Sequence, residues 1–165
     1  MNEFKNKSII RFPISKSGYI KMQTELDNLI SKDRHEIINA IAEARAHGDL
    51  SENAEYHAAK EKQALIENKI ADLTDKLNRA EIIDLSNIEK DKIQFGATVK
   101  MIDYENNREV KYTIVSDYEA DIKQGLISVY SPVSKALMGK KIGDEVEVET
   151  PKGFRYYEIL SVDYI

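Results

Sequence analysis

Two long stretches in the first half of the chain repeat apolar residues at the period of an α-helix. Between residues 16 and 46 the apolar side chains recur at spacings of three or four, with Asp33 interrupting the row: Tyr19, Met22, Leu26, Leu29, Ile37, Ile41 and Ala44. Such a row forms one apolar helix face. Ser15, a preferred N-cap residue, precedes this stretch, and Gly48 is well placed to end the helix in a left-handed conformation, with a positive φ. The pattern predicts a helix over residues 16–46, about 45 Å long.

The second stretch, from about Asp49 to Ile83, has a more regular seam. Its apolar residues alternate by four and three, which is the spacing of a coiled coil: Ile66, Ile70, Leu73, Leu77 and Ala80. Because few residues separate the two helices, they are expected to pack antiparallel as an αα-hairpin. Near the turn, small residues replace the large ones: Ala42, Ala44, Ala54, Ala58 and Ala59. We therefore predict that the helices approach closely at that end.

After residue 84 the helical period gives way to the shorter period of β-strands. Strands are indicated over residues 98–102, 110–115 and 126–130, with a turn at 105–107 between the first two. Ser131 and Pro132 suit the cap and first position of a short helix that closes at Gly139. A second strand pair, over residues 145–149 and 154–160, is joined by a turn at 150–153. This half of the chain is predicted to be a small, mostly antiparallel α+β domain.

These patterns divide the chain into four parts. Residues 1–14 are expected to form a loose N-terminal tail, and residues 15–84 an antiparallel coiled-coil hairpin with its acidic tip at 47–54. A linker follows over residues 85–94, and residues 95–165 form the globular domain. The fold class is therefore α+β.

Composition narrows the classes of protein that the chain can belong to. Of its 165 residues, 42% are hydrophobic and 32% charged, as in a globular protein with much solvated helix surface. The net charge of -5 argues against a basic nucleic-acid coat, so any nucleic-acid contact is local. The absence of cysteine excludes disulfides and thiolate metal sites. Without an apolar run long enough to cross a membrane, a soluble cytoplasmic protein is expected.

Two carboxylates, Asp49 and Glu52, lie in the polar turn between the predicted helices. Their spacing matches a capping box at the start of the second helix, and spacing alone favours that structural interpretation. Capping does not explain why a long hairpin carries a polar, narrow end. Mg²⁺ prefers oxygen ligands and often binds one or two carboxylates while keeping several waters. The two acids can therefore complete a magnesium site begun by another protein and a phosphate, as two-metal phosphodiester chemistry requires.

Other polar residues near the turn allow further interpretations. His47 and His57 can be combined with Asp49 as a zinc site, but no HExxH spacing exists and a fourth ligand is missing. Arg45 and Lys60 lie on the helix ends nearest the turn, where they are either solvated charges or phosphate contacts. The sequence contains no glycine-rich phosphate loop, Ser-His-Asp set or nucleophilic cysteine.

Three motifs occur in order along the chain: AEARAHGDLSENAEYHAAKE at residues 42–61, preceded by EII at 36–38; FGATV at 95–99; and ISVYSPVSKALMGKKIGD at 127–144. They closely resemble the Gre family of bacterial transcript-cleavage elongation factors, in particular its GreA branch. The resemblance extends from Pro13 to Ile165. It implies an N-terminal antiparallel coiled coil, a C-terminal domain with an FKBP-like fold, and RNA polymerase as the partner.

The resemblance also implies a mechanism. In this family the globular domain docks at the mouth of the polymerase secondary channel, and the coiled coil enters the channel. Asp49 and Glu52 match the two tip acids, which help to hold a second Mg²⁺ and to position the attacking water. The polymerase's own active site then hydrolyses the backtracked RNA. The chain is accordingly expected not to be an enzyme alone, to bind Mg²⁺ only jointly with the polymerase, and to be a monomer whose hairpin satisfies its own seam.

Four further residues receive expected roles from the resemblance. Arg45 and Lys60 match basic positions that are associated with the RNA 3′ segment. Ser131 and Pro132 match a loop at the polymerase docking surface. Relatives often carry a basic residue at Ser51 and Arg at Lys60, so the basic patch of this chain is weaker than usual, because Lys lacks the bidentate guanidinium. This weakness favours GreA-like cleavage of short RNA segments.

Three alternatives remain open on sequence alone. A polymerase inhibitor of the same architecture would block the channel, but such relatives tend to have extra Asp residues at the tip, whereas residues 48–53 here keep the cleavage-type sequence GDLSEN. An FKBP-like domain can be a peptidyl-prolyl isomerase, which requires an aromatic-lined pocket, and the chain has no Trp. A plain coiled-coil adaptor would not need a special tip.

Overall fold

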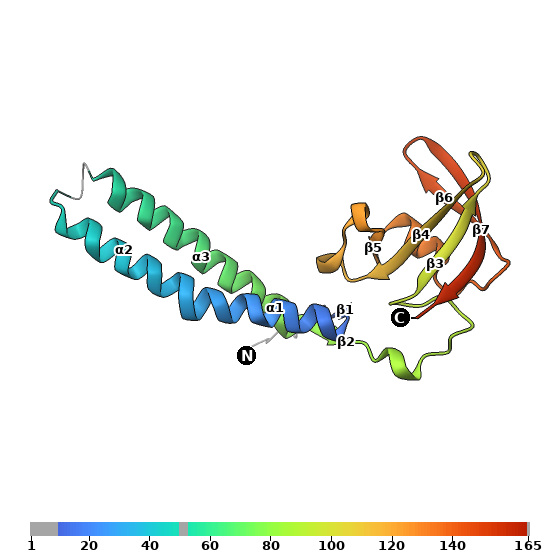
Figure 1. Cartoon of the computed structure of the whole chain (residues 1–165), viewed down its shortest axis with the longest axis horizontal. Coiled ribbons are helices and arrows are strands. Elements are labelled where there is room, and N and C mark those ends of the chain that lie inside the picture. The colour runs from blue at the N-terminus through green and yellow to red at the C-terminus, as the bar shows by residue number, and fades with distance from the viewer. Residues whose placement is uncertain (1–9, 50–52, 165) are drawn as a thin grey trace, which may run out of the picture. The chain divides into compact units, whose positions relative to one another are not determined.

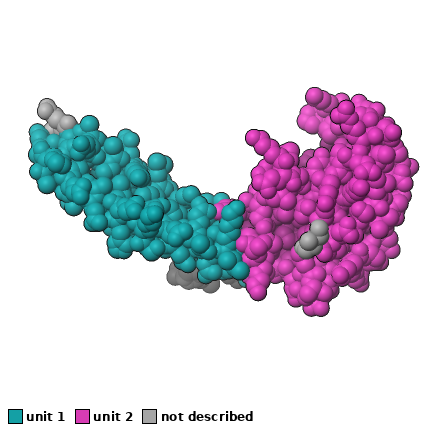
Figure 2. Space-filling model, viewed as in Figure 1, with its two compact units in different colours: residues 1–11, 19–80 teal, residues 12–18, 81–165 magenta. Residues whose placement is uncertain are grey.

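The structure is a computed structural model that describes residues 10–49 and 53–164. It contains two compact units, coloured separately in Figure 2. One unit consists of residues 1–11 and 19–80, and the other of residues 12–18 and 81–165. The first is the helical hairpin and the second contains the β-sheet, which confirms the predicted α+β class. No helix in the described part of the chain has the length and apolar character needed to cross a membrane.

The first helical stretch, drawn in blue to cyan in Figure 1, has the predicted limits. It is not α-helical throughout. It consists of α1 (Lys16–Asn28), a π-helical turn (Leu29–Asp33) and α2 (Arg34–Ala46). The backbone N–H of Gly18 donates to Ser15 Oγ at 3.0 Å, so Ser15 is the predicted N-cap. Leu29 and Ile37 are both buried although eight residues separate them, which is more than two α-helical turns. The wider π turn absorbs the surplus and keeps both residues on one face.

The second helix is shorter at both ends than the predicted span of residues 49–83. It is α3 (Ala54–Arg79), with Asn53 as its N-cap. The helix ends early because β2 (Ala80–Ile82) pairs with β1 (Phe12–Ile14) in a two-stranded sheet. The prediction of a loose tail is therefore wrong for residues 12–14, and residues 1–9 lie outside the described part of the chain.

The predicted hairpin seam is confirmed. The buried positions are Ile37, Ile41 and Ala44 on α2, and Ala59, Ile66, Ile70 and Leu73 on α3. The prediction of small residues facing one another near the turn holds for Ala44 and Ala59 but is wrong for Ala42, Ala54 and Ala58, which are exposed. Helix residues two apart point in different directions, so Ala42 and Ala44 cannot both face α3.

A bidentate ion pair crosses the middle of the hairpin. Arg34 Nε and Nη2 donate to the two carboxylate oxygens of Glu67 at 2.7 and 2.8 Å. These hydrogen bonds lower the pKa of Glu67 and raise that of Arg34. A second pair, Lys69 with Glu25 at 2.6 Å, also joins the two helical stretches. Because these side chains are partly exposed, water and salt screen both pairs.

We expect Glu67→Gln to lower the thermal stability of the chain slightly at neutral pH. A carboxyl group whose pKa is lowered by folding stabilises the fold above its ordinary pKa, about 4.3 for Glu, and loses that contribution as the pH falls through the lower, folded value. The difference in melting temperature between wild type and variant should therefore shrink below about pH 4. Glu61→Gln, at an exposed position of α3, is the control. A difference that persists in acid would contradict the ion-pair explanation.

The second unit is built on a five-stranded sheet. Its strands are β3 (Thr98–Asp103), β4 (Arg108–Val115), β5 (Leu126–Ser128), β6 (Glu145–Thr150) and β7 (Gly153–Asp163), in the spatial order β5-β4-β3-β7-β6. All neighbours are antiparallel except β4 and β5. The helix α4 (Pro132–Leu137) contacts β5 and β6, and short 3-10 turns lie at Leu85–Asn87, Asp117–Glu119 and Ile122–Gln124. The predicted, mostly antiparallel domain is confirmed.

Ile93 belongs to the core of this unit, although the sequence pattern assigns it to the linker. It is fully buried, and its backbone is fixed by hydrogen bonds from Ile93 N to Lys140 O at 2.9 Å and from Gly139 N to Ile93 O at 2.8 Å. The remaining buried residues of the cluster are Ala97, Val99, Met101, Ile114, Ile127, Leu137, Val146, Val148, Tyr157 and Ile159. The packed part of the unit thus begins before residue 95.

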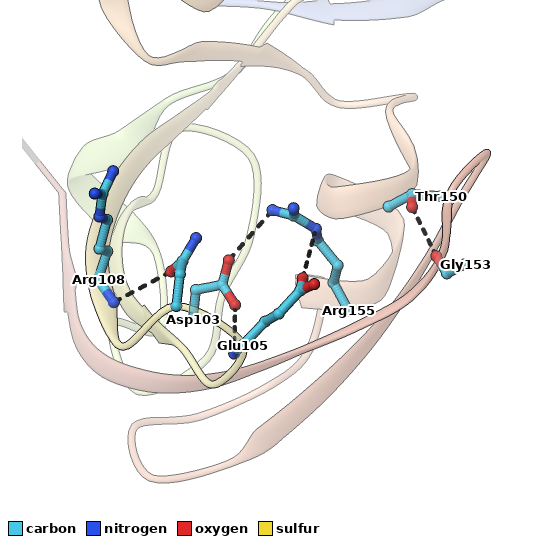
Figure 3. Close-up of polar contacts among 7 residues, drawn as sticks. Asp103, Glu105, Arg108, Thr150, Gly153 and Arg155 are labelled. Carbon is cyan, nitrogen blue, oxygen red and sulfur yellow. Dashed lines mark hydrogen bonds and ion pairs between the residues drawn. The ribbon is translucent and has the colours of Figure 1, made fainter.

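A buried carboxylate stabilises the turn between β3 and β4 (Figure 3). Asp103 is 2% exposed, and its oxygens accept hydrogen bonds from Glu105 N at 2.9 Å and from Arg155 Nη1 at 3.3 Å. Arg155 Nε lies 3.5 Å from Glu105 Oε2. A hydrogen bond with Tyr157 and the charges of Glu105 and Asp103 raise the pKa of Arg155. The charge of Asp103 is therefore paired inside the unit, as burial of a carboxylate requires.

Candidate functional site at the hairpin turn

The first helical stretch ends in a short turn. His47 is the C-cap of α2, and its backbone N–H donates to Ala44 O at 3.2 Å. Gly48 follows with a φ of +126°, a backbone conformation that residues other than glycine rarely adopt. The prediction that Gly48 ends the helix with a positive φ is confirmed. Asp49 comes next, outside both helices.

The start of α3 does not use the predicted capping box. Its N-cap is Asn53, whose Oδ1 accepts a hydrogen bond from Tyr56 N at 3.1 Å. The capping interpretation is therefore wrong for Asp49, which precedes the N-cap and does not occupy it. Glu52, the other predicted acid, lies outside the described residues. Asp49 therefore lies before the N-cap of α3, at an exposed position of the turn.

Asp49 is exposed and lines a shallow, open depression together with His47, Asn53, Ala54 and Glu55. Within residues 10–49 and 53–164, no three histidine and acidic side chains lie close enough together to hold a metal ion. The zinc interpretation with His47 and His57 therefore receives no support. What the described turn provides is an exposed carboxylate at the end of the hairpin.

The two basic residues predicted to contact RNA lie on opposite helices near the turn. The guanidinium carbon of Arg45 is 5.9 Å from the centre of the Tyr56 ring, a cation–π geometry. Tyr56 in turn meets His57 edge to face, with ring centres 5.6 Å apart. Lys60 Nζ donates to Gln63 Oε1 at 3.3 Å. Both basic side chains are exposed, and their assignment to RNA stays a prediction.

The predicted docking residues Ser131 and Pro132 lie in the second unit, at the start of α4. Ser131 is the N-cap, with Oγ accepting from Ser134 N at 3.1 Å, and exposed Pro132 is the first helical residue. The predicted helix start is confirmed. Their docking role stays a prediction.

Sequence reasoning missed the two roles of Asn53. Its side-chain amide also donates to Ala44 O at 2.6 Å, across the turn. Asn is as good an N-cap as Asp, so its place directly before the helix was a usable signal. The contact with Ala44 had no signal in the sequence, because it depends on how closely the helices approach.

Comparisons with known proteins agree with this arrangement of a hairpin followed by a sheet domain. Residues 12–82 match the family described as "Transcription elongation factor, N-terminal", and residues 88–164 match "Transcription elongation factor, GreA/GreB, C-term". The chain belongs to the Gre family of transcription elongation factors. It is 54% identical over 154 residues to the transcription elongation factor GreA of Beijerinckia indica, covering 93% of this chain and 98% of the relative. The GreA of Agrobacterium fabrum is 53% identical, with the same coverage.

A solved structure, the GreA factor homolog 1 (Gfh1) protein of Thermus thermophilus, is 28% identical and has a TM-score of 0.43, with 93% of this chain and 99% of that chain covered. The sequence matches make this chain a transcription elongation factor of the GreA type. The isomerase and adaptor alternatives are not favoured by these matches.

Proposed function

We propose that the hairpin of this Gre factor enters the secondary channel of RNA polymerase and delivers Asp49 and Glu52 to the polymerase active site. There the two carboxylates stimulate hydrolysis of backtracked RNA by the polymerase itself. In this proposal the factor is not an enzyme alone. It rescues arrested complexes by helping the polymerase to generate a new RNA 3′ end.

The observation that carries the proposal is the position of Asp49. It is exposed between α2 and α3, and Asn53 rather than Asp49 caps α3. Capping is the structural role that best fits an acid in such a turn. Because Asn53 is the N-cap of α3, capping of this helix does not account for the acid at position 49. An exposed acid at the end of a hairpin suits delivery to a second protein.

The chemistry of Asp49 fits a magnesium ion that is shared with a partner. A carboxylate is the kind of ligand that Mg²⁺ prefers, and one or two carboxylates are the usual protein contribution. Asp49 and Glu52 would hold the ion, and the polymerase would supply the other ligands. When bound, Mg²⁺ stabilises negative charge at the phosphate and favours ionisation of a bound water. Asp49 and Glu52 would help to orient the ion and would add their negative charge to the site.

The remaining contacts of the proposal involve both units. Arg45 and Lys60 are basic residues on the two helices beside the turn, and we propose that they contact phosphates of the RNA 3′ segment. Ser131 and Pro132, at the surface where α4 begins, would contact the rim of the secondary channel. The buried seam between α2 and α3 supports a monomer, since the hairpin packs its apolar face against itself. We expect the factor to act in the cytoplasm with its polymerase.

The proposal predicts that the two acids are needed for cleavage but not for binding. Purified polymerase is stalled in a backtracked complex, and the release of short RNA is followed with and without the full chain. Wild type should accelerate release, and the double variant Asp49→Asn, Glu52→Gln should lose the acceleration while still competing with wild type. Normal stimulation by the double variant would refute the proposal. Inhibition of the polymerase by wild type, without cleavage, would instead identify a channel-blocking factor.

A further inference from the structure

We infer that Asn53 is a positioning residue that fixes the two ends of the acidic turn against each other. This inference rests on the proposed function, because it concerns how Asp49 is held for that reaction. Asn53 itself is not assigned any contact with RNA or metal. Its side chain joins the last turn of α2 to the first turn of α3, on either side of the segment that carries the acids.

The two hydrogen bonds of the Asn53 amide go to different helices. Nδ2 donates to Ala44 O on α2 at 2.6 Å, and Oδ1 accepts from Tyr56 N on α3 at 3.1 Å. Ala44 O also accepts from His47 N at 3.2 Å, the contact that closes the end of α2. One planar side chain thus connects a helix C-terminus to the following helix N-terminus.

The contact with Ala44 requires an amide. An N-cap needs only an acceptor, and Asp or Ser provides one as well as Asn does. The carbonyl oxygen of Ala44 needs a donor, and an ionised Asp has none. Ser has a hydroxyl donor, but its side chain is shorter than that of Asn and carries a single polar atom. It therefore cannot cap α3 with one atom and donate to α2 with another, as the Asn amide does. Capping alone therefore accounts for only one of the two bonds.

Neighbouring contacts support a tight closure at the same place. Ala44 and Ala59 are buried in the seam, where small side chains let the helices come together. Arg45, next to Ala44, lies over the ring of Tyr56, whose backbone N–H is the group that Asn53 caps. Two non-covalent contacts therefore hold the helix ends together: the hydrogen bond from Asn53 to Ala44 and the cation–π contact of Arg45 with Tyr56. Positioning of this kind matters because small displacements of catalytic groups are costly in rate.

The test separates the maximal rate of stimulated cleavage from the factor concentration that gives half of it. Asn53→Asp and Asn53→Ser both keep a capping acceptor and lose the amide donor. We expect each to lower the maximal rate about tenfold while the half-maximal concentration stays unchanged. Ala58→Asp adds a negative charge at an exposed position of α3 that does not line the depression around Asp49, and it should keep the wild-type rate. A role in capping alone predicts wild-type rates for Asn53→Asp and Asn53→Ser, and that result would overturn the inference, as would an equal loss in Ala58→Asp.

Hydrogen exchange of the isolated chain distinguishes this inference from the proposed function. Loss of the amide should speed exchange of backbone N–H groups around residues 44–57 in both Asn53 variants and leave the seam near Ile70 unchanged. If exchange accelerates but wild type itself does not stimulate cleavage, the proposed function has failed while the cross-link stands. If exchange is unchanged, Asn53 does not hold the turn and the inference is overturned.

Discussion

Asp49→Asn is expected to lower the rate of stimulated RNA cleavage by about 100-fold at saturating factor. The substitution keeps the size of the side chain and one oxygen but removes the charge that a hard cation prefers. Folding should be unaffected, because Asp49 is exposed and lies outside both helices. The measurement is single-turnover cleavage in a stalled complex, with the concentration for half-maximal stimulation as the measure of binding.

Glu55→Gln provides a matched control for this prediction. Glu55 lines the same depression as Asp49, and its substitution makes the same change of charge in the first turn of α3. It should retain stimulation. Raising the Mg²⁺ concentration should partly restore the Asp49→Asn rate if the lost carboxylate is a metal ligand. Equal defects in the two variants, with no response to Mg²⁺, would point to general electrostatics and against a ligand role.

Ile93→Ala is expected to destabilise the sheet unit by about 2–5 kcal/mol. Ile93 is fully buried, and removing three carbons from a packed core leaves a cavity as well as losing apolar burial. The effect should appear in denaturant unfolding followed by a signal from the sheet unit, as a lower midpoint with an unchanged slope. The hairpin's helical signal should change less.

Ile142→Ala is the control for the core prediction. Ile142 is 61% exposed, so the same truncation there should leave the unfolding midpoint close to that of wild type. A small effect at Ile93 would mean that residues 85–94 are a linker after all, as the sequence pattern indicates. A large effect confirms that the packed unit begins before the first strand of the sheet.

The sequence pattern predicted the elements well and their ends less well. A long row of apolar residues such as Ile66, Ile70 and Leu73 identifies the buried face of a helix by repetition. In the same way, the alternation of apolar and polar residues identified the strands β6 and β7. The ends of α3 depended on single contacts instead. At the N-terminus, Asn53 and not Asp49 is the N-cap of α3. At the C-terminus, Ala80 begins the strand β2, whose partner β1 lies far away in the sequence. Local propensity cannot supply such distant pairings.

The exposed position of Asp49 in the turn could be predicted from the sequence, whereas the contacts around it could not. Two acids in a turn between amphipathic helices indicated a delivered carboxylate, and the structure leaves Asp49 exposed there. The hydrogen bond from Asn53 to Ala44 could not be predicted from the sequence, because it depends on the distance between two helices. The packing of Arg45 on Tyr56 was likewise visible only in three dimensions.

The π-helical turn at Leu29–Asp33 has a consequence for the direction in which the hairpin's end faces. Each residue of an α-helix rotates the chain by about 100°, so one residue more or fewer in that turn would rotate α2 about the helix axis relative to α1. The lengths of α2 and α3 set how far Asp49 lies along the hairpin, whereas this irregular turn sets the side to which the end of α2 faces. Insertions in this region would therefore redirect the tip before they noticeably lengthened it.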